Sequence, residues 1–587
     1  MRSFFPLSIT LLGALASANQ LAQMNKALNK VFRHDANTTI LHVQHFKPGD
    51  YLLSTAPGDG TQPIIPRAKN GVTVVKLFIR TTGDAPAEPD PVTGTDVGIE
   101  FWFPDSLFWT GRIINFVDGG FQGSPHVTAP NSSEESSFTS VQFSEWASKY
   151  GYVSAVSNGG HITPLTHDAN YNGILDTSYL VTADNRYNLE GWKNMAWQGN
   201  HLMAIKSKEI AKAYYGRDHN SAYLLGCSSG GRQAYQVAQQ FPNDYNGLLV
   251  IAPSLHGSQY YTSTGYPTIV VNNDLQDQPF TDTQLEMVSQ KAVAHGDTAI
   301  TGRHDGYITD WQSNTYDPAK DLSVLRVEDG GNCTDSWAIS MVQAQALNKI
   351  WYGVTKNGYA PDPSVDNGSK LNKSSDLLYW GKLRGIRLKY VIAPATVPSV
   401  FLPAAFLNTS LGDPEYFANG TNAWTSSSYQ EFAQYIIDGP GIDDKIIQMD
   451  AADPDIREFQ SLGGKLLVYH GLADQFSPPQ HSAAYYEDSA SITGGMNATA
   501  DFHRLFFVPG MDHCSPSSNQ AGNANIPFAQ SEQFLEKLVT WVEKGDAPEK
   551  VIAHSDDNLV SRPICPYPAL PKYDGHGNVN FASSFSC

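Results

Sequence analysis

The sequence is poor in cysteine, in positive charge and in long apolar segments. Its 587 residues include only 5 cysteines, too few for a small fold built on disulfides. Its 39 lysines and arginines stand against 58 aspartates and glutamates, and the resulting net charge of -19 argues against binding to nucleic acid or to an anionic membrane. Because 41% of the residues are hydrophobic and only 17% are charged, we expect a packed core, in more than one domain.

The N-terminus has the pattern of a signal peptide. Met1-Arg2 is its positive end, Phe4 to Leu15 is an apolar run, and Ala16-Ser17-Ala18 fits a cleavage site. The apolar run is too short to span a bilayer comfortably. We therefore expect residues 1–18 to be removed and the mature, soluble chain to be secreted, starting near Asn19. A buried N-terminal helix is the alternative.

If the chain is secreted, its Asn-x-Ser/Thr sequons are candidate N-glycosylation sites, which mark exposed backbone in secreted proteins. They occur at Asn37, Asn131, Asn332, Asn367, Asn372, Asn408, Asn419 and Asn497. Four of them lie between Asn367 and Asn419, so we expect that region to be mostly surface and glycosylated.

Short apolar runs of strand length alternate with helix-length segments in the first and last thirds of the chain. The expected strands are Val72–Ile79, Ile113–Val117, Tyr152–Val156, Ala222–Leu225, Leu248–Ile251, Lys465–Tyr469 and Arg504–Val508. The clearest expected helix covers Gly191–Tyr215, and a further helical piece covers Ser336–Tyr352. This alternation predicts an α/β fold with a parallel sheet covered on both faces.

The middle third interrupts this alternation with a segment that is rich in expected loops and in sequons. We interpret residues 254–440 as an inserted lid domain over the C-terminal edge of the sheet, where open α/β folds place their ligands. The core would then consist of residues 19–253 and 441–587.

A G-x-S-x-G motif, residues 226–230, follows the expected strand Ala222–Leu225 and precedes a helical segment. This is the pattern of a nucleophile elbow, in which glycines allow a tight turn that exposes the serine. The motif alone is weak, because chance matches are common in a chain of this length, but the strand and helix around it support it. We predict Ser228 as the nucleophile and the N–H of Ser229 as an oxyanion donor.

A nucleophilic serine needs a histidine as base, and the histidine needs an acid that orients it. In α/β hydrolases these residues follow in the order Ser, acid, His, each at the end of a strand. Asp474 follows Lys465–Tyr469, and His513 follows Arg504–Val508. We predict His513 as the base and prefer Asp474 to the competing Asp512 as the acid, because a sequence-adjacent carboxylate is poorly placed to align the imidazole. The alternatives are a turn aspartate and a structural loop histidine.

Two cysteines flank these predicted residues. Cys227 precedes Ser228 and Cys514 follows His513. A Cys227–Cys514 disulfide would tie the serine turn to the histidine loop, where displacements of about 1 Å matter greatly. Two buried free thiols are the alternative, but in a secreted chain we expect the bridge.

These motifs resemble those of the tannase and feruloyl esterase family of secreted esterases, which carry Cys-Ser, Asp and His-Cys with the two cysteines bridged. The similar blocks are Gly226–Gln233, Gly463–Asp474 and Arg504–Cys514, and the resemblance runs from about Gly71 to the C-terminus. It implies an α/β-hydrolase fold with a large inserted lid domain. The tail from Arg562 to Cys587 also resembles the family, which implies a second bridge, Cys565–Cys587.

The resemblance indicates further residues. Trp109–Gly123 resembles the family's strand and Gly-rich turn that face the elbow. A Gly-rich loop lets a backbone N–H approach a substrate oxygen, so Gly119 or Gly120 is the second candidate oxyanion donor. An ordinary Gly-Gly turn is the alternative. His201 falls where the family has a helix histidine, and we interpret it as structural.

The chain departs from the family in the lid, where the family carries an Asp-rich calcium loop beside a disulfide. Here Thr298 and Thr301 stand where acidic ligands are expected, and no cysteine flanks the loop. Calcium prefers six to eight oxygens with several carboxylates. The remaining candidate ligands are Asp297, Asp305 and Asp310. We favour a loop without calcium, and we expect Cys333 to be the odd, unpaired cysteine.

We predict a secreted carboxylic-ester hydrolase that requires no cofactor. The resemblance implies small, plant-derived esters of aromatic acids, galloyl or feruloyl, as substrates. Several lid aromatics are candidates for an apolar acyl pocket, although most should be core: Tyr260, Tyr261, Trp351 and Tyr379. One alternative is a serine peptidase with the same constellation. Another is a non-catalytic protein that binds a glycan or a partner on a hydrolase scaffold.

Overall fold

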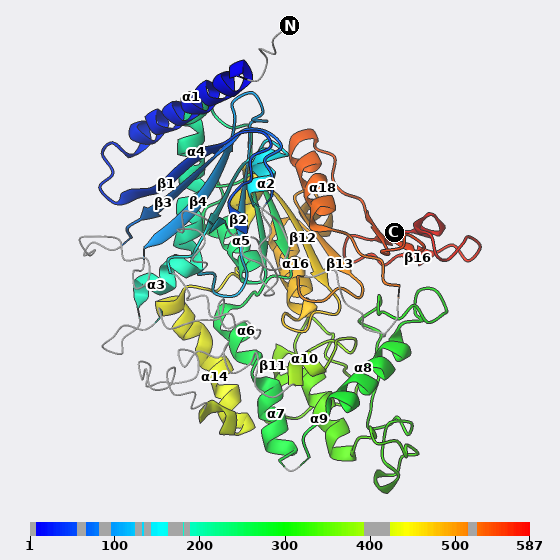
Figure 1. The fold of residues 1–587 in the computed structure, drawn as a ribbon. Coiled ribbons are helices and arrows are strands. Elements are labelled where there is room, and N and C mark those ends of the chain that lie inside the picture. Colours follow the sequence, from blue (N-terminus) through cyan, green and yellow to red (C-terminus); the bar gives the residue numbers. More distant parts are fainter. Residues whose placement is uncertain are drawn as a thin grey trace. The chain divides into compact units, whose positions relative to one another are not determined.

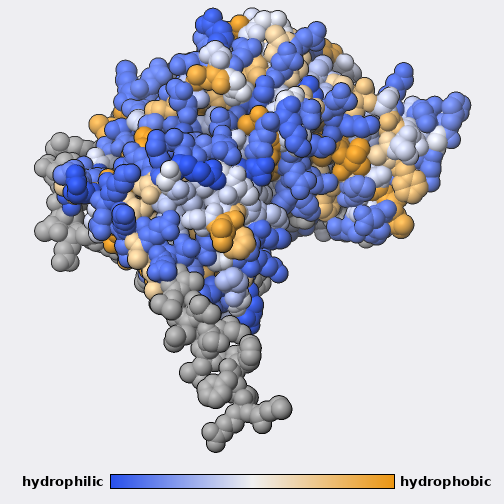
Figure 2. Space-filling view, turned by 90° about the horizontal axis from the view of Figure 1, so that it is seen from above, coloured by the Kyte–Doolittle hydropathy of each residue, from blue (hydrophilic) through white to orange (hydrophobic). Residues whose placement is uncertain are grey.

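The computed structural model describes residues 7–55, 66–81, 96–123, 132–133, 143–161, 180, 188–276, 278–392, 423–514 and 525–587. The chain forms two compact units. The first unit contains Met1–Thr182 and Asn188–Leu248, and the second contains Ala183–Tyr187 and Leu249–Cys587. The face of the protein in Figure 2 is mostly hydrophilic, with apolar residues in small separate groups.

The first unit holds six neighbouring strands of the central sheet, in the order β1-β3-β4-β7-β5-β8. The pairs β1/β3, β3/β4 and β4/β7 are antiparallel, whereas β5 pairs in parallel with both β7 and β8. The strand bounds are β1 Thr38–Phe46, β3 Val72–Ile79, β4 Val97–Pro104, β5 Arg112–Val117, β7 Val153–Ser157 and β8 Ser221–Cys227. A short parallel pair, β2 Ser54–Thr55 with β6 Ser132–Ser133, lies outside this sheet.

The inner strands are buried along their whole length. Every residue of β3, β4, β7 and β8 is buried, which explains why their sequences are continuous apolar runs. One charged pair breaks this rule. Lys76 of β3 lies directly opposite Glu100 of β4, and its Nζ is 2.9 Å from the carboxylate, with both side chains inaccessible to solvent. Burying either charge without the other would be strongly unfavourable.

Helices pack on this sheet. They are α1 Leu7–Phe32, α2 Phe143–Ser148, α3 Leu189–Lys193, a π-helical turn Asn194–Gln198, α4 Gly199–Tyr215 and α5 Ser229–Gln240. Helix α1 lies beside α4 (Figure 1) and buries Met24, Ala27 and Leu28. The helix therefore extends well beyond the expected signal peptide, into the segment that cleavage would leave. Within the described residues, no helix is both long and apolar enough to cross a membrane.

The second unit contains the last two strands, β12 Lys465–Gly471 and β13 His503–Val508, which pair in parallel. Strand β9, Gly247–Ile251, leads into this unit, and the N–H of Ala252 after it donates to the carbonyl of Tyr469. Tyr469 stacks on Phe534 of α18, Ser531–Lys544. The next residue, His470, is hydrogen-bonded to Ser482 of α16, Pro479–Thr493. Because successive strand residues point to opposite faces, α16 and α18 cover opposite faces of β12.

Irregular segments and short helices fill the region between β9 and β12. Its elements are α6 Gly257–Ser263, α7 Tyr266–Asp274, α8 Asp282–Gly296, 3₁₀ turns Val327–Asp329 and Ala423–Ser426, α9 Met341–Tyr352, β10 Gly353–Thr355, β11 Leu377–Trp380, α10 Lys389–Ile392, α14 Tyr429–Ile442, a π turn Asp443–Ile447 and α15 Arg457–Ser461. Helices α7 and α9 pack together (Figure 1). These elements belong to the same compact unit as β12 and β13. A lid that is a domain of its own stays a prediction.

The C-terminal part adds helices and small strand pairs. The helices are α16 Pro479–Thr493, α17 Met496–Ala500 and α18 Ser531–Lys544, and a 3₁₀ turn covers Ala582–Ser584. The pairs are β14 Val551–His554 with β15 Ser561–Ile564, and β16 Lys572–Tyr573 with β17 Phe585–Ser586. A disulfide joins Cys565 to Cys587.

The strands expected from the sequence all exist, each within two residues of the expected bounds. Two strands of the central sheet were not anticipated, β1 and β4, and neither were the short strands outside it. Strand β1 is only partly buried, and β4 carries a buried glutamate, so neither has the plain pattern of a core strand. The single helix expected over Gly191–Tyr215 is divided by the π-helical turn.

Candidate active site

The elbow, Gly226–Gly230, lies between β8 and α5 in the first unit. Ser228 has φ 59° and ψ -119° and is buried. A non-glycine residue in this region of φ is strained, and such strain persists only where the surroundings hold it. The N–H of Arg232 donates to the carbonyl of Ser228, which starts α5 directly after the turn.

Two glycines of the elbow have no room for a side chain. A Cβ on Gly226 would lie 2.3 Å from the carbonyl oxygen of Gly230. A Cβ on Gly230 would lie 2.2 Å from the carbonyl oxygen of Val117, the last residue of β5. The sequence pattern therefore reflects close backbone contacts on both sides of the serine.

The candidate oxyanion glycines follow β5 directly. Val117, the last residue of β5, contacts Gly230 of the elbow, so the turn that contains Gly119 and Gly120 lies next to the elbow. Gly120 has φ 59°, a conformation that favours glycine. The first unit thus brings Ser228, Ser229 and this turn into one neighbourhood.

His201 on α4 has a structural environment. Its Nδ1 is 2.7 Å from the carboxylate of Asp244, and its ring stacks on Phe241 with centroids 3.9 Å apart. These contacts agree with the structural role expected from the sequence.

Asp474 begins the acid loop, Asp474–Ser477, just after β12 in the second unit. Its carboxylate is completely buried. One oxygen, Oδ1, accepts hydrogen bonds from the N–H groups of Phe476 and Ser477, both 2.7 Å away. The other, Oδ2, is 2.7 Å from His513 Nδ1 and 3.1 Å from His470 Nε2. The carboxylate therefore faces a donor on every side.

These donors determine the charge of Asp474. Burial alone would raise the pKa of the carboxyl, but the charge of His513 and the hydrogen bonds from both imidazoles outweigh it. The pKa of Asp474 therefore lies well below its usual value, and the group is a carboxylate at neutral pH.

His513 follows β13 and meets Asp474 through Nδ1. The backbone N–H of His513 donates to Gln475 Oε1 at 3.1 Å. The imidazole ring makes an edge contact with the ring of Phe476, with centroids 5.2 Å apart. The acid loop thus holds the histidine through side chain, backbone and ring. Since Nδ1 donates to the carboxylate, Nε2 is the nitrogen that would accept a proton, as in a catalytic triad.

Asp512, the competing acid, has a different partner. Its carboxylate is 3.2 Å from the guanidinium of Arg387. Burial raises the pKa of Asp512 to about 7, although Arg387 opposes the rise. In the second unit the acid that contacts His513 is Asp474.

The acid loop is also held from the segment before α10. Nζ of Lys382, a buried residue, donates to the carbonyl of Phe476, and burial lowers the pKa of Lys382 to about 8. Among the lid aromatics, Tyr260 accepts a hydrogen bond from Ser477 Oγ at 3.2 Å. Tyr261, Trp351 and Tyr379 are buried core residues.

The cysteines fall into two groups. Cys227 and Cys514, beside the two predicted catalytic residues, are both disulfide-bonded, and Cys565 and Cys587 form the tail bridge. Cys333 is free and buried, as predicted.

The three candidate calcium ligands do not converge. Asp297 accepts hydrogen bonds from His304 Nδ1 and the N–H of Gly306. Asp305 is 3.2 Å from the guanidinium of Arg562, and the carboxylate of Asp310 accepts a long hydrogen bond from the N–H of Ser313. Within the described residues no group of three acidic, histidine or cysteine side chains could hold a metal. Protein donors bind the carboxylates of Asp297 and Asp305, and a loop without calcium stays a prediction.

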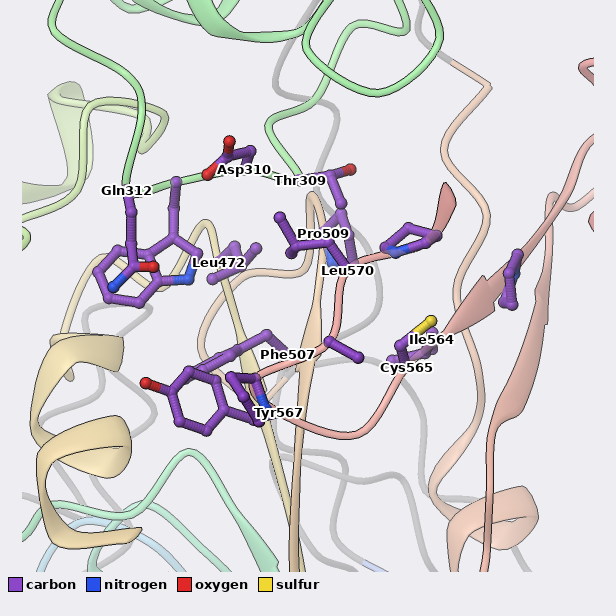
Figure 3. Close-up of a pocket in the computed structure, with 15 residues that line it drawn as sticks. Thr309, Asp310, Gln312, Leu472, Phe507, Pro509, Ile564, Cys565, Tyr567 and Leu570 are labelled. Atoms are coloured by element: carbon purple, nitrogen blue, oxygen red, sulfur yellow. The ribbon is translucent and has the colours of Figure 1, made fainter. Parts of the chain in front are cut away.

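A small surface pocket lies elsewhere in the second unit (Figure 3). It is lined by residues 309–312, by Phe507 and Pro509 at the end of β13, and by the tail around Tyr567 and Leu570. No predicted catalytic residue lines it, so we assign it no part in catalysis.

Sequence reasoning missed His470, Lys382 and Arg387. A signal existed only for His470, which lies four residues before Asp474 inside the block Gly463–Asp474. The contacts of Lys382 and Arg387 join segments about a hundred residues apart, which no local pattern reveals.

An elbow serine after a strand of a mostly parallel sheet, and an Asp–His pair after its last two strands, define an α/β hydrolase. Two solved structures support the fold. Feruloyl esterase B from Aspergillus oryzae aligns with a TM-score of 0.72 and 22% identity over 97% of this chain and 100% of that chain. Tannin acyl hydrolase from Aspergillus niger aligns with a TM-score of 0.68 and 18% identity over 97% and 95%.

Sequence comparison is more specific. Residues 82–587 match the family model described as tannase and feruloyl esterase. A probable feruloyl esterase of Arthroderma benhamiae is 30% identical over 416 residues, 70% of this chain and 71% of the relative. A mono(2-hydroxyethyl) terephthalate hydrolase of Piscinibacter sakaiensis is 24% identical over 539 residues, 84% and 82%. The chain belongs to the tannase and feruloyl esterase family and is a carboxylic ester hydrolase.

Proposed function

We propose that this protein hydrolyses esters of hydroxybenzoic or hydroxycinnamic acids through an acyl-enzyme on Ser228. The observation that carries this proposal is the buried carboxylate of Asp474, 2.7 Å from Nδ1 of His513, in a chain whose strained serine turn precedes both residues. The substrate class is supported by the names of two relatives, a feruloyl esterase and a terephthalate ester hydrolase, because both act on esters of aromatic acids.

In the first half-reaction, Ser228 Oγ attacks the ester carbonyl carbon while Nε2 of His513 takes the hydroxyl proton. The carbonyl oxygen becomes an oxyanion, which the N–H groups of Ser229 and of Gly119 or Gly120 stabilise. Asp474 holds His513 in the tautomer that accepts this proton and stabilises the imidazolium that forms. When the intermediate collapses, the carbon–oxygen bond of the alcohol breaks and the imidazolium gives its proton to the leaving alcohol.

In the second half-reaction, water replaces the alcohol. His513 removes a proton from the water, the resulting nucleophile attacks the acyl carbon, and the bond to Ser228 Oγ breaks as the serine regains its proton. The products are the free acid and the original enzyme. Every step uses groups of the chain itself, so we propose that catalysis requires no cofactor.

We further propose that Cys227 and Cys514 are bonded to each other. The bridge would join the residue before the nucleophile to the residue after the base, and would limit their relative displacement. Peptide mapping of an unreduced digest tests this pairing, which is wrong if the two cysteines are recovered in separate peptides.

We propose that the protein is secreted after cleavage near Ala18 and carries N-glycans. Four sequon asparagines in the described residues are exposed: Asn37, Asn332, Asn372 and Asn497. Asn367 is half-buried and its amide donates to the carbonyls of Gln312 and Asn314, so we expect no glycan there. Asn131, Asn408 and Asn419 lie outside the described residues. N-terminal sequencing and mass spectrometry after deglycosylation test both points.

The test of the reaction is Ser228→Ala, assayed on methyl ferulate, methyl gallate and a short aliphatic ester. We expect kcat/KM on the best substrate to fall by about 10⁴-fold or more, since removal of a triad nucleophile has effects of that order. Unchanged turnover would overturn the mechanism. Peptide cleavage without ester hydrolysis would indicate a peptidase, and the absence of both in the wild type would indicate a binding protein.

A further inference from the structure

A second histidine contacts the carboxylate of Asp474. His470, near the end of β12, is completely buried. Its Nε2 is 3.1 Å from Asp474 Oδ2 and 3.1 Å from the carbonyl oxygen of Ser477. Its Nδ1 is 2.8 Å from Ser482 Oγ on α16, which covers this face of β12 (Figure 1). The ring therefore joins the acid loop at both of its ends to the neighbouring helix.

The chemistry of these partners determines the hydrogen on Nε2 of the ring. A carboxylate and a carbonyl only accept hydrogen bonds, so Nε2 of His470 carries a hydrogen and donates to both. Nδ1 shares a hydrogen bond with the hydroxyl of Ser482, which can donate or accept. This arrangement satisfies every polar atom of a side chain that water does not reach.

The shared oxygen makes His470 relevant to the reaction. Asp474 Oδ2 receives one hydrogen bond from His470 and one from His513, while Oδ1 receives two from backbone N–H groups. The backbone donors and His470 together determine how the carboxylate is rotated about its bond. That rotation decides where Oδ2 meets Nδ1 of His513.

We propose that His470 is a positioning residue that orients Asp474 toward His513 and moderates the negative charge that His513 experiences. This inference rests on the triad proposed above. Without His470, Oδ2 keeps a single donor and attracts the His513 proton more strongly, while the Ser477 carbonyl and the Ser482 hydroxyl lose their partner inside the protein. The same change both loosens the geometry and makes His513 more basic.

Other ionisable groups surround this pair. The ring centroids of His481 on α16 and of His470 are 5.7 Å apart. Burial keeps the pKa of His481 well below its usual value, so the ring of His481 is neutral. Lys382 is hydrogen-bonded to the carbonyl of Phe476 in the acid loop. Asp512 interacts electrostatically with both Asp474 and His513. The hydrogen-bond partners of His470 Nε2 are Asp474 and Ser477, so a substitution of His470 leaves His481, Lys382 and Asp512 in place.

The experiment compares His470→Leu with His470→Gln, which keeps an N–H donor near the position of Nε2. For His470→Leu we expect kcat on methyl ferulate to fall by about 10- to 100-fold, as for other outer supports of a reacting group, with KM within about twofold. The acid limb of the kcat/KM profile, which reports deprotonation of His513, should move to higher pH. His470→Gln should recover most of kcat and return the limb toward the wild type.

His503→Leu is the matched control. His503 is equally buried and lies on the neighbouring strand, but at its start, where its ring contacts Tyr486. The control should lower the melting temperature without moving the acid limb. Should His470→Leu not fold, Ser482→Ala, which removes only the hydroxyl partner of Nδ1, replaces it, with a smaller loss of kcat expected.

Two outcomes would overturn the inference: an unmoved acid limb in the folded His470 variants, or equal losses of kcat in His470→Leu and His503→Leu. Failure of the triad itself is recognised separately. If Ser228→Ala and Asp474→Asn both keep wild-type activity, the proposed mechanism is wrong whatever the His470 variants do.

Discussion

The elbow of the first unit and the Asp474–His513 pair of the second unit position their reactive groups by different means. Ser228 is placed by backbone: a strained φ of 59°, two glycines without room for a Cβ, and the start of α5. His513 is placed by side chains, above all the carboxylate of Asp474 and the amide of Gln475. A backbone turn is local in sequence, whereas the side-chain network joins segments about 40 residues apart.

The difference has consequences for robustness. The elbow depends on the absence of atoms, so adding a single methyl group disturbs it. The Asp–His pair depends on hydrogen-bond donors that compensate a buried charge, so removing one donor or the charge disturbs it. Variants of the two kinds separate these two modes of positioning.

The largest effect should come from the acid itself. Asp474→Asn keeps the shape but removes the charge and the acceptor that selects the tautomer of His513, so kcat should fall by about 10⁴-fold. Asp512→Asn, its matched control one residue before the histidine, should retain kcat within about tenfold. The reverse ranking of the two variants in steady-state assays would make Asp512 the acid.

The elbow offers the next largest effect. Gly230→Ala places a Cβ 2.2 Å from the carbonyl of Val117, so the turn must move, and kcat should fall by about 10²-fold for a displacement near 1 Å. Gly216→Ala is the control, because Gly216 has φ 73° but no neighbour within 4 Å of a Cβ. It should lower stability by about 1–2 kcal/mol and leave kcat unchanged. A wild-type kcat in Gly230→Ala would mean that close backbone contact does not position Ser228.

A smaller effect concerns stability and pH. The pKa of Asp512 in the folded protein, about 7, exceeds its usual value of 3.8. Between about pH 4 and 7 the folded protein therefore binds a proton that the unfolded chain has lost, and this group's contribution to stability falls as the pH rises. The change is at most about 1.4 kcal/mol per pH unit. Asp512→Asn has no proton to lose, so its melting temperature relative to wild type should rise between pH 5 and pH 8.

The smallest effect should come from chelation. A calcium ion bound to residues 297–310 would hold that loop of the second unit by metal coordination. The carboxylates of Asp297 and Asp305, however, are already paired with protein donors. Dialysis against EDTA should leave the melting temperature and kcat unchanged. A lowered melting temperature that calcium restores would show that a metal holds this loop.

Much of the fold follows from local pattern. Strands buried on both faces need continuous apolar segments, so strands such as β3, β8 and β12 are visible in the sequence. Strand β4 is not, because its buried Glu100 is acceptable only opposite Lys76 of β3. Likewise the helical pattern of Met24, Ala27 and Leu28 in α1 is overshadowed by the signal-like run before it.

The sequence by itself indicated the serine turn, because the glycine spacing lies within five consecutive residues, but the close contact of Gly230 with Val117 of β5 is tertiary. The sequence also determined the order of serine, acid and base at the ends of strands. The sequence favoured Asp474 over Asp512 as the acid, but only the tertiary structure showed that Asp474 contacts His513, that Asp512 pairs with Arg387 and that His470 shares the same carboxylate oxygen. These choices depend on distances of about 3 Å between side chains from different segments, and hydrogen bonding has no sequence signature at that range.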